Sequence, residues 1–189
     1  MNNNLIYANI LIGDNMKIEK VITGTLEENC YVLIKNNTCL VIDPGDDYHK
    51  IKEVIGDNKV LGVLITHSHF DHVGALRHFL TKRSVKIFKK SNTLEKEYAI
   101  GDFKFEGIHT PGHSADSITF YFSDDNAMFV GDFIFNGSIG RCDLPSGSMN
   151  EMQKSLEKIK KYDDNIVLYC GHGEDTTLGK EKESNPYFN

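Results

Sequence analysis

The sequence predicts an α/β protein, from its length, its composition and the order of its apolar segments. The chain has 189 residues, the size of one ordinary domain. Hydrophobic residues make up 40% and charged residues 25%, which is average for a globular protein and excludes disordered, collagen-like and disulfide-scaffold classes. Strand-like segments are interspersed with helical ones, and the order strand-strand-helix-strand-helix partly recurs. We expect one domain over residues 16–189, after an Asn-rich extension at residues 1–15.

The domain is predicted to open with an antiparallel meander. Three short apolar runs have the composition of strands, at 17–23, 30–35 and 38–43. The dipeptide Asn36-Asn37 between the last two runs suits a tight hairpin turn.

Later elements alternate in type. Apolar residues at helical spacing predict helices at 48–55, 73–79 and about 148–161. Strands are predicted where β-branched and aromatic residues gather, at 60–65, 85–88, 103–108, 117–122, 127–130 and 166–170. The polar tail after Gly179 ends with Tyr187 and Phe188, whose rings are expected to pin it to the body.

Charge and cysteine usage limit the partners and the compartment. Lys and Arg total 21 and Asp and Glu total 27, a net charge of −6 that disfavours partners bound through phosphate. The N-terminus has no basic region before an apolar stretch, so neither a signal peptide nor a transmembrane helix is expected. The four cysteines form no CxxC pair, which favours reduced thiols. We expect a cytoplasmic protein with no nucleic-acid partner and no membrane partner.

A cluster of histidines follows the strand predicted in the middle of the chain. The segment Thr-His-Ser-His-Phe-Asp-His at 66–72 contains an HxHxDH pattern. Residues two apart in an extended chain point to the same side, so His67 and His69 can converge on one ion. Asp71 and His72, at the turn into a helix, can face a second ion. Imidazole suits zinc or iron and the carboxylate compensates charge, so the segment predicts a metal site.

Three later residues supply the same chemistry. They are His113, Asp132 and His172. Each follows a predicted strand and is flanked by glycine, which lets the backbone approach closely at a sharp turn. Ligands at strand ends on one rim can meet in space.

Together these motifs resemble the metallo-β-lactamase superfamily, and within it the small glyoxalase II-like (hydroxyacylglutathione hydrolase-like) hydrolases. The resemblance runs from about residue 16 and includes the loop at 137–145 and the Gly171-His172-Gly173 segment. It implies a four-layer αβ/βα sandwich with a two-metal site at one edge of paired sheets. The ligand set it implies is His67, His69 and His113 for one ion, Asp71, His72 and His172 for the other, and Asp132 as the bridge.

The implied cofactor is two divalent metal ions, with zinc favoured and iron or manganese as alternatives. Two ions that share a water lower its pKa from about 15.7 towards neutrality, which gives a bridging hydroxide that attacks an acyl carbonyl. A thiolate leaves readily, so the implied substrate is a small-molecule thioester. The implied catalytic residues are Asp71 and Asp132; Asp71 is assigned first as a ligand, and a role in orienting the water is left open.

Other polar residues near these motifs have two interpretations each. Asp43 is either a turn carboxylate or a partner that orients a ligand histidine, and the resemblance favours the partner. The related loop of glyoxalase II carries a basic residue that contacts glutathione, so Arg141 is either a substrate residue or half of a surface salt bridge. Cys142, beside it, is expected to be inert. Three further histidines are expected to lie outside the site: His49, His78 and His109.

Departures from related enzymes narrow the choice of activity. Secreted lactam hydrolases lack the bridging aspartate that Asp132 supplies here, and diiron flavoproteins place Glu where His69 stands. Nucleases of the superfamily add a further module and a basic surface. Two enzyme hypotheses remain: a two-metal thioester hydrolase, and a persulfide dioxygenase with one iron held by His67, His113 and Asp132. A metal-binding domain without turnover is the third.

Overall fold

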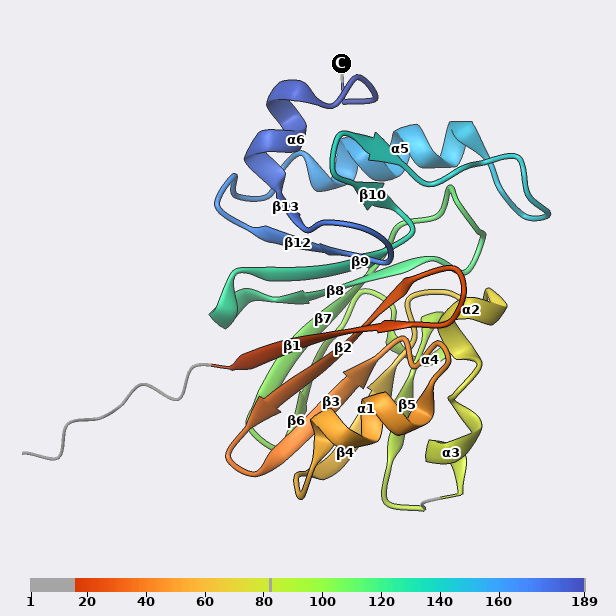
Figure 1. Ribbon diagram of the computed structural model, residues 1–189. Helices are drawn as coiled ribbons and strands as arrows, with labels where there is room; N and C mark the ends of the chain where they lie inside the picture. Colours follow the sequence, from red (N-terminus) through yellow and green to blue (C-terminus); the bar gives the residue numbers. More distant parts are fainter. Residues whose placement is uncertain (1–15, 82, 189) are drawn as a thin grey trace, which may run out of the picture.

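Two β-sheets packed face to face, with helices on both outer faces, form the fold (Figure 1). The computed structural model describes residues 16–81 and 83–188, so the predicted extension at 1–15 lies outside the described residues. This is the four-layer αβ/βα arrangement that the resemblance implies. In the described ranges, every helix is too short or too polar to cross a bilayer.

The first sheet joins the N-terminal meander to parallel strands. In spatial order its strands are β1 (Lys17–Thr23), β2 (Glu28–Lys35), β3 (Thr38–Ile42), β4 (Lys59–Leu64) and β5 (Lys86–Phe88). The pairs β1–β2 and β2–β3 are antiparallel, whereas β3–β4 and β4–β5 are parallel. Asn36 and Asn37 both have positive φ, 48° and 57°, as a two-residue type I′ hairpin turn requires, so the predicted hairpin is confirmed.

The second sheet also contains a parallel pair. In spatial order its strands are β13 (Thr176–Thr177), β12 (Val167–Cys170), β9 (Ala127–Gly131), β8 (Ile118–Phe122), β7 (Phe103–His109) and β6 (Glu97–Ile100). Only β9–β12 is parallel among its pairs. A separate hairpin consists of β10 (Ile134–Phe135) and β11 (Ser138–Ile139).

Helices cover the two outer faces, and shorter helical turns join the strands. They are α1 (Tyr48–Ile55), α2 (Phe70–Val73), α3 (Arg77–Leu80), α4 (Lys90–Thr93), the 3₁₀ turn η1 (Ser123–Asp125), α5 (Met149–Ile159) and α6 (Leu178–Ser184). Ile51 of α1 and Phe79 of α3 pack against the first sheet, and Leu156 of α5 and Leu178 of α6 pack against the second. Figure 1 shows α5 and α6 beyond β12 and β13, on the opposite side of the molecule from α1 and α3.

The core between the sheets is rich in aromatic rings. Phe129, on β9, lies with its ring centroid 5.2 Å from Tyr31 of the first sheet, 5.6 Å from Phe122 and 4.7 Å from Tyr169. Edge-to-face and stacked pairs at these separations add to the free energy gained by burying the rings. The contact with Tyr31 ties the central strand of one sheet to the other sheet.

Two predictions of local structure are wrong. The predicted helix at 73–79 is split into α2 and α3, because the amide of Ala75 donates to the carbonyls of Pro44 and Gly45 in another loop, at 3.0 and 2.8 Å. The tail was expected to be held by the rings of Tyr187 and Phe188, but only Phe188 is buried while Tyr187 is 39% exposed.

We expect Phe129→Ala to lower the free energy of unfolding by about 3–5 kcal/mol, because it leaves a cavity between the sheets. The matched control is Phe70→Ala, since Phe70 is 75% exposed; its effect should stay within about 0.5 kcal/mol. Urea unfolding of both variants measures the difference. Equal effects would show that the inter-sheet core does not carry the stability assigned to it.

Candidate metal centre

The seven side chains that the sequence singled out meet at one edge of the sandwich, where strands end. Four of them follow β4, one lies in the loop between β7 and β8, one follows β9 and one follows β12. In that order they are His67, His69, Asp71 and His72, then His113, Asp132 and His172. Loops after parallel strands are the usual place for binding groups in open α/β sheets.

Three histidines form the first cluster. Nδ1 of His69 lies 3.1 Å from Nε2 of His67 and 2.8 Å from Nε2 of His113. Three imidazole nitrogens that converge in this way can hold one metal ion. His67 is buried and His69 is half-buried, so the cluster lies at the surface of the core and not inside it.

The second cluster combines two histidines with a carboxylate. Oδ2 of Asp71 lies 3.4 Å from Nε2 of His172 and 3.9 Å from Nε2 of His72. This group also has the donor atoms and the spacing to hold a metal ion. The two clusters are neighbours, because the rings of His67 and His72 lie 4.1 Å apart between centroids.

Asp132 faces both clusters at once. Its Oδ1 lies 3.3 Å from Nε2 of His72 and 3.6 Å from Nε2 of His172, while its Oδ2 lies 3.5 Å from Nε2 of His113. The preceding Gly131 has a φ of +53°, and a Cβ there would collide with the side chain of Thr66. Glycine is therefore required at this turn to bring the carboxylate between the clusters.

Two of the rings are oriented by backbone carbonyls. Nδ1 of His113 donates to the carbonyl of Arg141 at 2.8 Å, and Nδ1 of His172 donates to the carbonyl of Leu26 at 3.0 Å. A carbonyl oxygen only accepts, so the proton of each ring is on Nδ1. Each Nε2 therefore presents its lone pair to the clusters, as a metal ligand must.

Asp43 and Thr66 orient two more rings. The carboxylate of Asp43 accepts from the amide and the hydroxyl of Thr66, at 2.7 and 2.5 Å, and lies 3.0 Å from Nδ1 of His72. Because the Thr66 hydroxyl donates its only proton to Asp43, its oxygen accepts from Nδ1 of His67 at 3.1 Å. Asp43 is thus a partner that orients a histidine, the interpretation that the resemblance favours.

The protonation of the rings follows from burial and from the carboxylates. Burial lowers the pKa values of His67 and His69, and nearby histidines add to this effect, so these rings stay neutral with their lone pairs free. Burial also opposes charge on His72, but the negative charges of Asp132 and Asp43 outweigh it and raise the pKa of that ring. Burial would raise the pKa of Asp132, yet the attraction of the neighbouring His72 ring holds it below its usual value.

Unsatisfied buried atoms show that the centre fits divalent ions. Among the described residues, three side-chain atoms are buried without a hydrogen-bond partner: Oε1 of Glu28, Nε2 of His72 and Oδ1 of Asp132. Orphaned polar atoms are rare in folded proteins, and the last two lie 3.3 Å apart on two potential ligands. The donor set of imidazole nitrogens and carboxylate oxygens suits zinc, iron or manganese.

Glu28 is part of the centre that sequence reasoning missed. It is fully buried at the start of β2, with Oε1 3.8 Å from Nδ1 of His72 and Oε2 accepting from the hydroxyl of Thr23. Burial raises the pKa of this carboxyl to about 9. The one signal in the sequence is an acidic residue two positions before the predicted strand at 30–35.

The remaining predicted residues lie apart from the clusters. The exposed guanidinium of Arg141 forms two hydrogen bonds with the carboxylate of Asp143, at 2.7 and 2.8 Å. Burial raises the pKa of the Cys142 thiol, as expected for an inert cysteine. The three other histidines do not belong to the two clusters. His78 stacks on Tyr48, the ring of His109 donates to the carbonyl of Ala115, and His49 is exposed.

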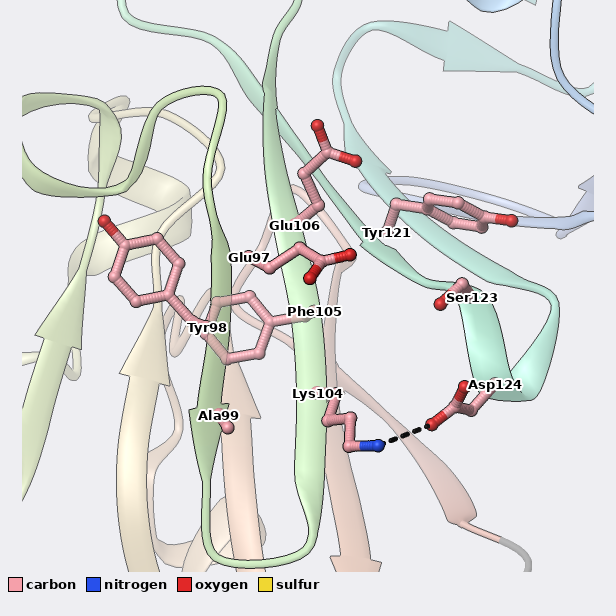
Figure 2. A pocket seen from close by; sticks show the side chains of 9 residues that line it. All are labelled: Glu97, Tyr98, Ala99, Lys104, Phe105, Glu106, Tyr121, Ser123 and Asp124. Carbon is pink, nitrogen blue, oxygen red and sulfur yellow. Dashed lines mark ion pairs between the residues drawn. The ribbon is translucent and has the colours of Figure 1, made fainter.

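A separate pocket of about 540 Å³ lies on the outer side of β6, β7 and β8. Figure 2 shows the carboxylates of Glu97 and Glu106 on neighbouring strands there, with Lys104 paired to Asp124 at 3.9 Å. Glu97 and Glu106 are direct cross-strand partners, and like charges in that position repel. None of the seven clustered side chains lines this pocket.

The sandwich and its paired histidine and aspartate clusters define a class of metal-binding proteins with the site at the edge of two sheets. The chain belongs to the metallo-beta-lactamase superfamily, whose family model matches residues 23–97 and 93–172. It is 30% identical to a probable metallo-hydrolase, YqgX, of Bacillus subtilis, across 92% of this chain and 98% of that protein. It is 31% identical to the hydroxyacylglutathione hydrolase GloC of Haemophilus influenzae, across 92% of this chain and 99% of that protein.

Solved structures have the same fold. The BLEG-1 B3 metallo-beta-lactamase superposes with a TM-score of 0.85 at 27% identity, across 92% of this chain and all of that one. TTHA1623, solved in a di-iron-bound form, superposes with a TM-score of 0.79 at 28% identity, across 89% and 99% of the two chains.

We expect Asp43→Asn to weaken metal affinity by about 10–100-fold, the usual cost of removing the partner of a ligand histidine. Asparagine tolerates the φ of 45° at this position, so the change removes charge and leaves the backbone in place. Competition with a chelator measures the affinity, and Asp57→Asn, at an exposed position, is the matched control. Equal affinities for the two variants would show that Asp43 does not support the centre.

Proposed function

We propose that the protein is a hydrolase of small-molecule thioesters that uses two divalent metal ions. The observation that carries the proposal is the carboxylate of Asp132, whose two oxygens face two separate clusters of ligand atoms. GloC supports the substrate class by its name, hydroxyacylglutathione hydrolase, and by a match over nearly its whole length. TTHA1623 supports the number of ions, because it was solved with two irons.

The ligands proposed for the first ion are His67, His69 and His113, those for the second are Asp71, His72 and His172, and Asp132 is the bridge. When bound, such ions supply Lewis acidity and lower the pKa of water from about 15.7 to about 7. Zinc is the proposed occupant, with iron or manganese as alternatives, because this donor set accepts all three.

The chain's own residues hold this chemistry in place. The carbonyls of Leu26 and Arg141 and the carboxylate of Asp43 fix the rings, so little reorganisation is needed when charge develops on a substrate. The carboxylate of Asp71 is 15% exposed whereas His72 behind it is fully buried, and besides its role as a ligand it would accept a proton from a water at the centre. The departing thiolate, with an ordinary pKa near 8.5, needs no strong general acid.

The direct test is a substrate screen of the purified, metal-loaded protein. We expect free thiol to be released from S-lactoylglutathione or from another acyl thioester. Oxygen uptake with glutathione persulfide and one iron per chain would instead support the dioxygenase, which needs only His67, His113 and Asp132. Opening of a β-lactam without thioester cleavage would move the protein towards the activity named for BLEG-1. Full metal occupancy without any turnover would indicate a binding domain.

We expect Asp132→Ala to lower both metal content and rate, because the variant loses the carboxylate that faces both clusters. Elemental analysis should find fewer than about two ions per chain, and kcat/KM should fall by more than about 100-fold. Asp163→Ala removes an exposed carboxylate and is the control. Normal metal content in Asp132→Ala would contradict a bridging role.

A further inference from the structure

A second pocket, of about 500 Å³, adjoins the first histidine cluster. His67 belongs to both, so a molecule that fills the pocket lies beside that one histidine of the proposed metal centre. The other side chains that line it are Ile65, Ser68, Lys89, Lys90, Ser91, Leu94 and Asp116. A volume of this size suits one small molecule.

The pocket has positive charge available for a ligand. Its one carboxylate, on Asp116, already accepts hydrogen bonds from the hydroxyls of Ser68 and Ser114, at 2.5 and 2.7 Å. Neither Lys89 nor Lys90 forms an ion pair with any described carboxylate. Two cations against one carboxylate give this pocket a net charge of +1 in a chain whose net charge is −6.

Lys90 is fixed towards the centre by its own hydrogen bond. Its ammonium donates to the carbonyl of Ala115, in the loop that carries His113. A held ammonium loses less side-chain entropy on binding an anion than a free one does. The apolar side chains of Ile65 and Leu94 offer a surface for the carbon skeleton of the same ligand.

Arg141 is a weaker candidate for this role than the two lysines. Its guanidinium is already occupied by both oxygens of Asp143, whereas the ammonium groups of Lys89 and Lys90 face no carboxylate partner among the described residues. An anion would have to displace Asp143 to bind Arg141, but it can bind the lysines directly.

We propose that Lys89 and Lys90 bind a carboxylate in the thiol half of the substrate, so that the enzyme selects acyl esters of acidic thiols. This inference rests on the proposed thioester hydrolysis and names the part of the substrate that the chain recognises. The lysines determine specificity and take no part in bond cleavage. Removing their charge therefore raises KM for acidic esters and leaves kcat unchanged.

The test compares two esters of one acyl group, S-lactoylglutathione and the uncharged S-lactoyl-N-acetylcysteamine. In the metal-loaded K89M/K90M variant, KM for the acidic ester should rise about tenfold or more, while KM for the neutral ester and both kcat values stay within about twofold. The control K154M/K161M removes two lysines from α5 and its end, with the same change of net charge, and should match the wild type. R141M, which keeps the backbone carbonyl that orients His113, tests the other cation near the centre.

Two kinetic results would overturn the proposal. One is an equal change of KM for both esters in K89M/K90M, which would indicate damage to the centre and not lost recognition of a carboxylate. The other is an unchanged KM in K89M/K90M with a raised KM in R141M, which would move recognition to Arg141.

A binding measurement separates this inference from the proposed activity. S-methylglutathione carries the same carboxylates but has no ester to cleave. Calorimetry should give a Kd about tenfold higher for K89M/K90M than for the wild type, and added salt should raise the wild-type Kd. Such a result in a protein that cleaves neither ester would support the pocket and overturn the hydrolase. No binding by the wild type, or equal binding by both proteins, would overturn the pocket.

Discussion

The two-sided contact of Asp132 is the constraint on which the centre depends. One carboxylate oxygen faces His72 and His172 and the other faces His113, so the clusters can work together only while the ends of β4, β9 and β12 stay in register. Backbone hydrogen bonds maintain that register: Ile118 donates to Thr66, and Gly171 donates to Gly131. The large core between the sheets therefore serves the site, because it holds the strand ends from two sheets at one edge.

Support for the rings comes from parts of the chain that are distant in sequence. His172 depends on the β1–β2 turn through Leu26, and His113 depends on the loop after β11 through Arg141. His67 and His72 share one network through Thr66 and Asp43. The ligand atoms are thus pre-oriented in the folded chain, which lowers the cost of reorganisation when a metal or a substrate binds.

Much of the fold and of the site was predictable from the sequence, because both leave local signals. Strand patterns, the Asn36-Asn37 turn and the seven histidine and aspartate positions depend on residue type and short spacing. What was missed depends on distant partners. The break in the helix at Ala75 arises from carbonyls some thirty residues away in the sequence. The segment β6 is a strand because it pairs with β7. No sequence motif marks the carbonyl of Leu26, since every residue has a carbonyl. The charge of Lys89 is likewise not marked, because only the structure shows which lysines lack an ion-pair partner.

The central claim is that the two clusters form one binuclear centre joined by Asp132. Electron paramagnetic resonance of the apo-protein reloaded with Mn²⁺ tests this most directly, because two ions that share a carboxylate are magnetically coupled. A centre joined by Asp132 gives a coupled spectrum when about two equivalents have bound. A spectrum of isolated Mn²⁺ at saturation, with no coupled signal, would contradict it.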